Sequence, residues 1–298
     1  MLRNNILSRA AGKVVRGGLY VLRNNFLAQS AKNILRGTLY KNYYQKLESL
    51  LYIYKVDGVE LVRVGTANDG GYIMLNDFVT GGGGIAYSFG IGAEISWDAD
   101  MAGRNYDVFM YDHTIDKLPK VLNGFHFFKE GIADSEKPSD DRLHSLEYYL
   151  KNNNHEDYKN MILKMDVEGA EWGFLSLVSS ETLKKFGQMV FEFHNMNNLS
   201  GNNAERMLTV LDKINKTHRL VHLHANNCCG GISFNGKIFG NVIEATYASI
   251  DKYKFSENDG VKLPLEIDSP NIPGRDEISL GYWNRKIDLT KPARIKNI

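Results

Sequence analysis

The sequence predicts an α/β fold in which a mostly parallel β-sheet is covered by helices on both faces. Short apolar runs alternate with segments of helical periodicity from about residue 56 onward, and this rhythm is typical of strand–helix–strand crossovers. A short apolar run that ends at Met165 is typical of a strand buried on both faces of a parallel sheet. With 43% hydrophobic residues, the 298-residue chain can bury a large core.

The expected elements follow one another in a regular order. A helix at 43–54 comes first, followed by a pair of strands at 59–64 and 72–75 that an Asp-Gly turn joins. The strands of the main sheet are expected at 85–89, 107–111, 125–129, 161–165, 189–193, 220–224 and 242–247. The helices are expected at 95–104, 140–151, 172–178, 181–186 and 203–216.

Residues 1–55 differ in composition and are predicted to form a basic helical extension, separate from a domain that spans 56–298. Nine basic and no acidic residues occur between Met1 and Leu47. The tetrapeptide Leu-Arg-Asn-Asn at 2–5 recurs at 22–25, twenty residues later. Apolar residues four apart predict two short amphipathic helices. These helices either pack on the domain or on a second subunit, lie on an anionic membrane surface, or act as a targeting segment.

A glycine-containing turn after the strand at 85–89 predicts a ligand site. Gly90 and Gly92 stand between this strand and the next helix, where glycines let the backbone approach a ligand and helix N-terminal amides face it. Asp112 ends the following strand, about 20 residues later, where an acid usually binds ribose hydroxyls. The third glycine of a dinucleotide fingerprint is absent, which argues against NAD.

The most informative stretch is Asp-Val-Glu-Gly-Ala-Glu at 166–171. Asp166 directly follows a buried strand, and Glu168 and Glu171 come within five positions of it. Parallel strands deliver such acids into a cleft at their carboxyl ends. The alternative is an acidic helix start, in which Glu168 and Glu171 face the helix dipole.

These segments, in this order, resemble the class I S-adenosylmethionine-dependent methyltransferases and, more narrowly, the FkbM-type family. The matching segments are Asn-Asp-Gly-Gly-Tyr at 68–72, Tyr-Ser-Phe-Gly-Ile-Gly at 87–92, Lys-Met-Asp-Val-Glu-Gly-Ala-Glu at 164–171 and Leu-Glu-Ile-Asp-Ser-Pro-Asn at 265–271. The resemblance runs from about residue 63 to about residue 278. It implies a class I methyltransferase (Rossmann-like) sheet whose last strand lies antiparallel beside the sixth.

The same resemblance implies an enzyme that uses S-adenosyl-L-methionine to O-methylate a hydroxyl of a carbohydrate or of a glycan or capsule precursor. The residues expected to bind the cofactor are Asp69, Tyr72, Gly90, Gly92, Asp112, Ala133, Asp134 and Asp166. Two alternatives stay open here: Asp69 and Tyr72 belong to a hairpin turn without a ligand, and Asp134 only caps a turn.

Methyl transfer to a hydroxyl needs a group that removes its proton. Imidazole titrates near neutral pH, so His194 is the first candidate for this base and His224 is the second. Asp166 and Glu168 are expected to orient substrate or cofactor. We assign no metal-binding residue: a divalent metal held by Asp166, Glu192, His194 and His224 is the less favoured alternative, because their spacing matches no compact metal motif.

Two other functions stay open: a non-catalytic membrane-surface scaffold that keeps the fold, and a different nucleotide-dependent enzyme such as a dehydrogenase. The net charge of +1 gives no indication of nucleic acid as a partner. We expect a small-molecule or glycan acceptor, and membrane contact only through the N-terminal helices. We expect a cytoplasmic protein; the alternative is a protein bound peripherally at the inner membrane surface. The adjacent Cys228 and Cys229 are expected to be reduced thiols.

Overall fold

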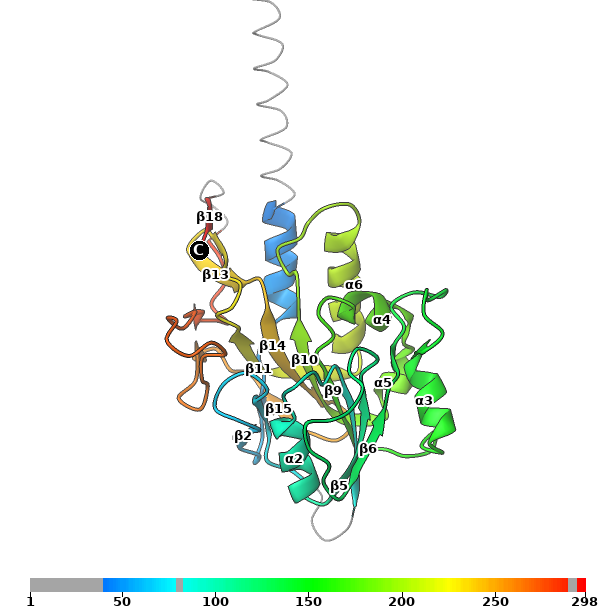
Figure 1. Ribbon diagram of the computed structural model, residues 1–298. Coiled ribbons are helices and arrows are strands. Elements are labelled where there is room, and N and C mark those ends of the chain that lie inside the picture. The colour runs from blue at the N-terminus through cyan, green and yellow to red at the C-terminus, as the bar shows by residue number, and fades with distance from the viewer. Residues whose placement is uncertain (1–39, 79–82, 289–293) are drawn as a thin grey trace, which may run out of the picture. The chain divides into compact units, whose positions relative to one another are not determined.

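The computed structural model describes residues 40–78, 83–288 and 294–298 (Figure 1). The chain divides into two compact units, Met1–Gln45 and Lys46–Ile298. A helix covers residues 40–50, four residues shorter at its C-terminal end than predicted. The twenty-residue repeat and its two helices lie outside the described residues, so the extension at 1–55 stays a prediction. Within the described ranges, no helix is long and apolar enough to cross a membrane.

The second unit is built on a seven-stranded sheet with the order β11-β14-β10-β9-β4-β5-β6. Neighbouring strands are parallel except at β14, which runs antiparallel to both β10 and β11. The predicted α/β fold class, a Rossmann-like sheet whose last strand lies antiparallel beside the sixth, is therefore confirmed. In chain order the strands are β4 (Gly84–Phe89), β5 (Tyr106–Tyr111), β6 (Phe125–Phe128), β9 (Met161–Met165), β10 (Phe186–Phe193), β11 (His218–Ala225) and β14 (Ile243–Ser249).

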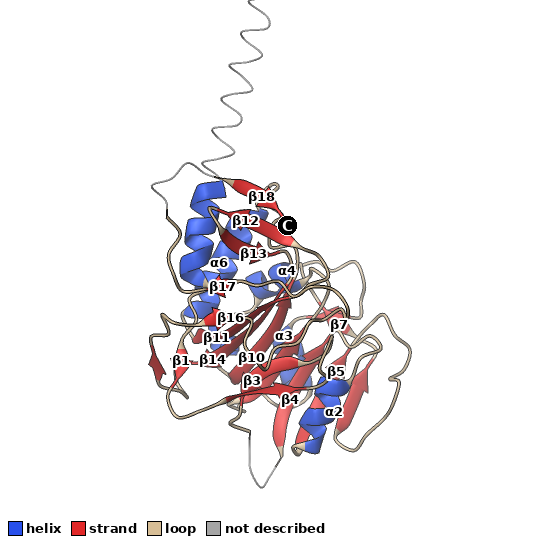
Figure 2. Cartoon of the chain, turned by 90° about the vertical axis from the view of Figure 1, so that its left-hand side faces the viewer, coloured by secondary structure: helices blue, strands red, loops and turns tan. Residues whose placement is uncertain are grey.

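Helices cover both faces of this sheet (Figures 1 and 2). They are α2 (Ser96–Gly103), α3 (Leu146–Asn152), α4 (Glu171–Leu177), α5 (Ser180–Leu183) and α6 (Asn203–Asn215). On one face, Val108 and Met110 of β5 pack with Trp97 of α2. Successive side chains of a strand point to opposite faces, so Tyr111 faces the other side of the sheet from Met110. The centroid of its ring lies 4.1 Å from that of Tyr149 in α3. The sheet is thus buried on both faces, which is why its central strands are mainly apolar.

A β-hairpin lies against the main sheet and carries one wall of the site. It consists of β2 (Leu61–Val64) and β3 (Tyr72–Leu75), which pair antiparallel. The amide side chain of Gln188 in β10 bonds both the N–H and the carbonyl of Leu75, at 2.9 and 3.1 Å. This two-way bond fixes the hairpin on the sheet, so the turn that holds Asp69 and Gly70 has a defined position.

One predicted helix begins later than expected. The prediction of a helix from residue 140 is wrong for its first six residues, because the helix α3 begins at Leu146. Ser145 caps it by accepting a hydrogen bond from the Tyr148 N–H. Upstream, Arg142 is bonded to Asp140, and β8 (Leu143–His144) pairs in parallel with β7 (Gly131–Ile132). Leu143, Leu146 and Leu150 have helical spacing and predict a longer helix, but Leu143 belongs to β8.

Short strands complete the unit. They are β1 (Lys55–Val56), β12 (Gly231–Phe234), β13 (Lys237–Gly240), β15 (Phe255–Ser256), β16 (Lys262–Leu263), β17 (Gly281–Tyr282) and β18 (Ile295–Asn297). β1 pairs with β15, β12 with both β13 and β18, and β16 with β17. The loop between β16 and β17 brings Asp268, Asn271 and Glu277 to polar residues of the sheet.

Candidate active site

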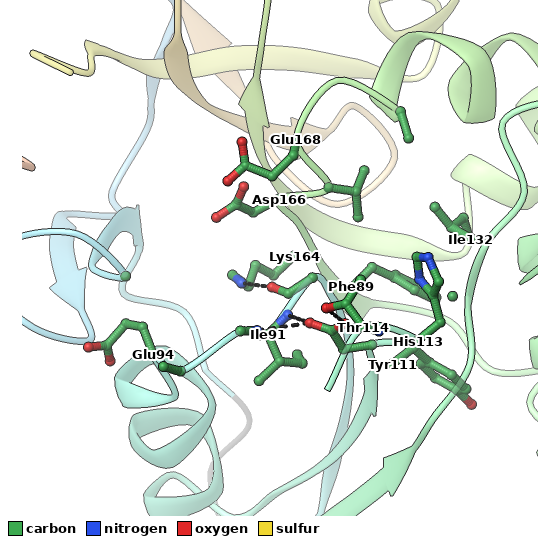
Figure 3. Close-up of a pocket in the computed structure, with 18 of the residues that line it drawn as sticks. Phe89, Ile91, Glu94, Tyr111, His113, Thr114, Ile132, Lys164, Asp166 and Glu168 are labelled. Carbon is green, nitrogen blue, oxygen red and sulfur yellow. Dashed lines mark hydrogen bonds between the residues drawn. The ribbon is translucent and has the colours of Figure 1, made fainter. Parts of the chain in front are cut away.

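A cavity of about 570 Å³ opens at the carboxyl ends of β4, β5 and β9 (Figure 3). β4 lies between β9 and β5, and the chain leaves β4 toward α2 and leaves β9 toward α4, on the opposite face. Ligands of open α/β sheets bind in the crevice that such a switch point creates. The volume lies within the range of small-molecule sites, roughly 300–1,000 Å³.

Gly90 allows two strands to meet at the floor of this cavity. Its φ is +75°, and a Cβ at this position would lie 1.6 Å from the carbonyl oxygen of Asp166. The Asp166 N–H donates to the carbonyl of Phe89 at 3.0 Å, and the Lys164 ammonium donates to the carbonyl of Gly90 at 2.8 Å. Only glycine fits here, because the backbones touch where β4 and β9 end.

Asp112 holds the glycine turn in place. Its Oδ2 accepts hydrogen bonds from the N–H groups of Ile91 and Gly92, both at 2.9 Å. Its Oδ1 accepts from the N–H and the hydroxyl of Thr114, at 2.8 and 2.6 Å. Burial alone would raise the pKa of Asp112, but these four hydrogen bonds outweigh burial and lower it. The carboxylate is therefore ionised and ties the loop after β5 to the turn after β4.

The lining of the cavity is acidic on one side and apolar on the other. Five lining residues are carboxylates and one is a lysine, Lys164. Figure 3 shows Asp166 and Glu168 beside each other, away from the rings of Phe89 and Tyr111. Burial and the nearby Asp166 raise the pKa of Asp69, which reflects the crowding of negative charge. The five carboxylates belong to Asp69, Glu94, Asp112, Asp166 and Glu168.

The structure brings most of the predicted cofactor-binding residues together. Those that line the cavity are Asp69, Gly90, Gly92, Asp112 and Asp166. Tyr72 lies behind this lining, with its hydroxyl 3.3 Å from Asp166 Oδ2. Ala133 and Asp134 follow the lining residue Ile132 but lie outside the lining itself, and Asp134 approaches Gly173 of α4. The roles of all these residues in cofactor binding stay predictions.

His194 lies directly after β10, beside the acidic wall. Its Nδ1 is 3.0 Å from Oε1 of Glu171, a residue with no exposed surface, and its Nε2 is 3.3 Å from Oε2 of Glu168. Burial lowers the pKa of His194, but the carboxylates, led by Glu171, outweigh it and raise the pKa. His194 itself is not part of the cavity lining, whereas Glu168 is, and so the predicted catalytic residues Glu168 and His194 do lie together.

His224 occupies a different environment. Its Nδ1 is 3.1 Å from Glu244 and its Nε2 is 2.6 Å from Glu277, and only 1% of the side chain is exposed. Burial lowers the pKa of His224, but the hydrogen bonds to both carboxylates outweigh it and raise the pKa to about 10. At neutral pH this imidazole is protonated, so it is a poor proton acceptor. Its predicted catalytic role is untested, and the contacts support a structural one.

Several polar residues lie between the cavity and His224; sequence reasoning missed Glu244 and placed Glu192 only in the less favoured metal site. Glu192 is 4% exposed and accepts a hydrogen bond from the side chain of Asn226 at 2.6 Å. Glu244 accepts one from Asn271 at 2.5 Å. Burial, Asp166 and Glu244 raise the pKa of Glu192 well above its ordinary value. The available signal was a charged residue inside an otherwise apolar strand, which applies to both Glu192 and Glu244.

The two cysteines differ from the sequence-based expectation. Cys228 and Cys229 form a disulfide between adjacent residues, so the expectation of two reduced thiols is wrong. The loop that carries them continues from β11 next to the polar residues described above. The Cys228 N–H donates to Asn226 Oδ1 at 2.8 Å, and the Cys228 carbonyl accepts from Arg275. These contacts hold the two cysteines in the tight turn that lets them bond.

Comparisons with known proteins return few matches. No family model and no curated protein matches the chain. The assignment to the FkbM-type family is therefore wrong, since a member would match a family model. Among solved structures, a protein described as "Putative hemolysin from Streptococcus thermophilus" shares 15% identity, with 67% of this chain and 76% of that chain covered and a TM-score of 0.33.

The Gly90 contact predicts a large difference between two neighbouring glycine substitutions. Gly92 also has a positive φ, +56°, but a Cβ there meets no atom within 4 Å. Gly92→Ala should therefore lower the free energy of unfolding only through the strain of a positive φ, by roughly 1–2 kcal/mol. Gly90→Ala adds a clash with the backbone and should lower it by roughly 3 kcal/mol or more. Urea denaturation of both variants measures this, and equal losses would contradict the role given to Gly90.

The environment of His224 predicts a pH-dependent stability. Because its folded pKa is raised to about 10, its stabilising contribution is complete below pH 6.5 and is lost as pH rises through 10. Between pH 6.5 and pH 10, the free energy of unfolding should fall more in the wild type than in His224→Gln, by on the order of 2–4 kcal/mol. If the free energy of unfolding changes with pH in the same way in the two proteins, His224 is not a protonated imidazole paired with Glu244 and Glu277.

Proposed function

We propose that this protein is an S-adenosylmethionine-dependent methyltransferase that O-methylates a hydroxyl of a carbohydrate or of a glycan precursor. The observation that carries the proposal is the acidic cavity at the switch point between β4 and β9, with one apolar wall and five carboxylates. Its volume of about 570 Å³ suits a nucleoside with an amino-acid tail. Phe89 and Ile132 offer flat and apolar surface for a base, and Asp69 and Asp166 offer acceptors for an ammonium group.

The charge of the cavity favours this cofactor over a dinucleotide. A sulfonium carries a positive charge, which neighbouring carboxylates attract in a partly buried site. The pyrophosphate of NAD carries two negative charges, and the same carboxylates repel them. Lys164, buried at 4% exposure and bonded to the carbonyl of Gly90, supplies one positive charge against the five carboxylates, so it offsets them only in part. A dehydrogenase is therefore the weaker alternative.

The chain has few chemical tasks in this reaction. When bound, S-adenosylmethionine supplies an electrophilic methyl group whose thioether leaving group needs no proton. The residues of the chain align the acceptor with that methyl group and take up the hydroxyl proton. His194 is the first candidate for this proton, since Glu171 orients the ring and Glu168 lies between it and the cavity. Asp112 shapes the turn on which the cofactor rests.

The acidic wall supports the proposed acceptor class. The carboxylates of Asp166 and Glu168 in the cavity lining accept hydrogen bonds from hydroxyl groups and offer little apolar surface. A sugar presents several hydroxyls close together and matches this character. The position that is methylated follows from which hydroxyl reaches His194 or Glu168.

Calorimetry on the full chain tests the cofactor. We expect S-adenosylhomocysteine to bind and NAD to give no heat. Asp112→Asn should weaken binding tenfold or more, because the amide has a single acceptor oxygen and cannot accept from the Ile91 and Gly92 N–H groups and from the Thr114 N–H at the same time. Asp116→Asn is the matched control: its side chain is 88% exposed, on the loop after β5, and should change nothing.

A second comparison tests the role of charge. The affinity of the cationic S-adenosylmethionine should fall more steeply with salt than that of the neutral thioether product, because screening weakens its attraction to the five carboxylates. If the two affinities fall equally with salt, the carboxylates do not attract the sulfonium charge. A folded wild type that binds neither compound would overturn the proposal and leave the scaffold function.

A further inference from the structure

We infer that Asp166, Glu192 and His194 form a binding site for a divalent metal ion, which holds the acceptor hydroxyl beside the cofactor cavity. One ligand atom from each residue lies within 4.8 Å of the other two. Oxygen and nitrogen ligands bind such ions at about 2.0–2.2 Å, so neighbouring ligands of one ion are about 3.0–3.5 Å apart. The three side chains need to close by about 1–2 Å, which rotation of the side chains can supply.

The backbone fixes this grouping. β9 and β10 are parallel neighbours, and Met165 is paired with Phe191. Asp166 follows Met165 and Glu192 follows Phe191, so these two acids are neighbours at the carboxyl end of the sheet. His194 lies two residues beyond Glu192, and so its side chain leaves on the same side as that of Glu192. The spacing of 26 residues between Asp166 and Glu192 matches no compact metal motif, which is why a metal at these residues and His224 was the less favoured alternative from sequence alone.

The surroundings orient each ligand, as is typical of metal sites. Glu171 accepts at 3.0 Å from His194 Nδ1, which leaves Nε2 as the ligand nitrogen. Tyr72 contacts Asp166 Oδ2 at 3.3 Å, and Asn226 donates to Glu192 Oε1 at 2.6 Å. Each carboxylate thus has one oxygen held by the protein and a second oxygen for an ion.

Charge provides an independent reason for a cation here. Glu192 is 4% exposed, and Glu171, in contact with His194, has no exposed surface. Glu171 also keeps one buried oxygen, Oε2, without a hydrogen bond. Buried carboxylates are costly unless a cation or a set of hydrogen bonds compensates them. A divalent ion between Asp166 and Glu192 supplies that compensation.

This site deepens the proposed methyltransferase function and rests on it for the role of the ion. An ion at this position lowers the pKa of a hydroxyl that it binds and orients that hydroxyl. His194 is then a ligand, and the proton passes to Glu168, whose side chain is 86% exposed and lines the cavity. The hydroxyl oxygen forms the bond to the methyl carbon, and the sulfur keeps the electron pair of the bond that breaks.

Binding of Mn²⁺, followed by electron paramagnetic resonance on the full chain without cofactor, tests the site directly. We expect one Mn²⁺ per chain in the wild type, displaced by Mg²⁺ or Zn²⁺. Glu192→Gln and Asp166→Asn should each weaken binding tenfold or more, because each removes a charged ligand. Asp116→Asn is the control, since Asp116 is 88% exposed on the loop after β5, outside the cavity and the metal cluster, and should leave Mn²⁺ binding unchanged.

Melting temperatures of the same proteins show whether the variants fold. Without metal, Glu192→Gln removes a buried charge, so this variant should melt at the wild-type temperature or above it. Mn²⁺ should raise the melting temperature of the wild type alone. Wild-type protein that binds no Mn²⁺, or binds it equally after Glu192→Gln, would overturn the site. If Mn²⁺ binds but S-adenosylhomocysteine does not, the metal site stands and the methyltransferase function fails; the reverse result rejects only the metal.

Discussion

The close approach of the ends of β4 and β9 is the constraint on which the rest of the site depends. Gly90 and Asp166 touch through their backbones, and this contact forms the floor of the cavity. Asp112 then fixes the turn above that floor, because its carboxylate accepts from the amides of Ile91 and Gly92. Without the glycine the strands separate, and without the carboxylate the turn has no fixed position.

The same geometry explains why acidic groups collect here. Parallel strands end at one edge of a sheet, so the residue after each strand joins its neighbours at that edge whatever their distance in sequence. Asp112, Asp166 and Glu192 come together in this way. The excess of carboxylates makes the edge receptive to positive charge, first a sulfonium in the cavity and then a metal ion beside it.

Much of the fold was predictable because it depends on local patterns. The strands of the sheet and the helices between them follow from apolar runs and their spacing, and the glycine turn and Asp166 follow from motifs. Long-range contacts were not predictable in the same way. His224 pairs with Glu244 of β14, 20 residues away, and with Glu277 of a loop, 53 residues away, so the sequence favoured a free imidazole that the structure buries. Family membership was also misjudged, because short motifs shared by a broad fold class do not define a family.

The position of β14 has a consequence for how the chain matures on the ribosome. This strand is made after β10 and β11, yet it lies between them and bonds to both. Until residue 249 has emerged, β10 presents a free apolar edge and β11 has no place in the sheet. Such an edge is a template for intermolecular pairing. The nascent chain is therefore most prone to aggregation late in synthesis. Loss of the C-terminal third would leave β10 as an unpaired edge of the sheet.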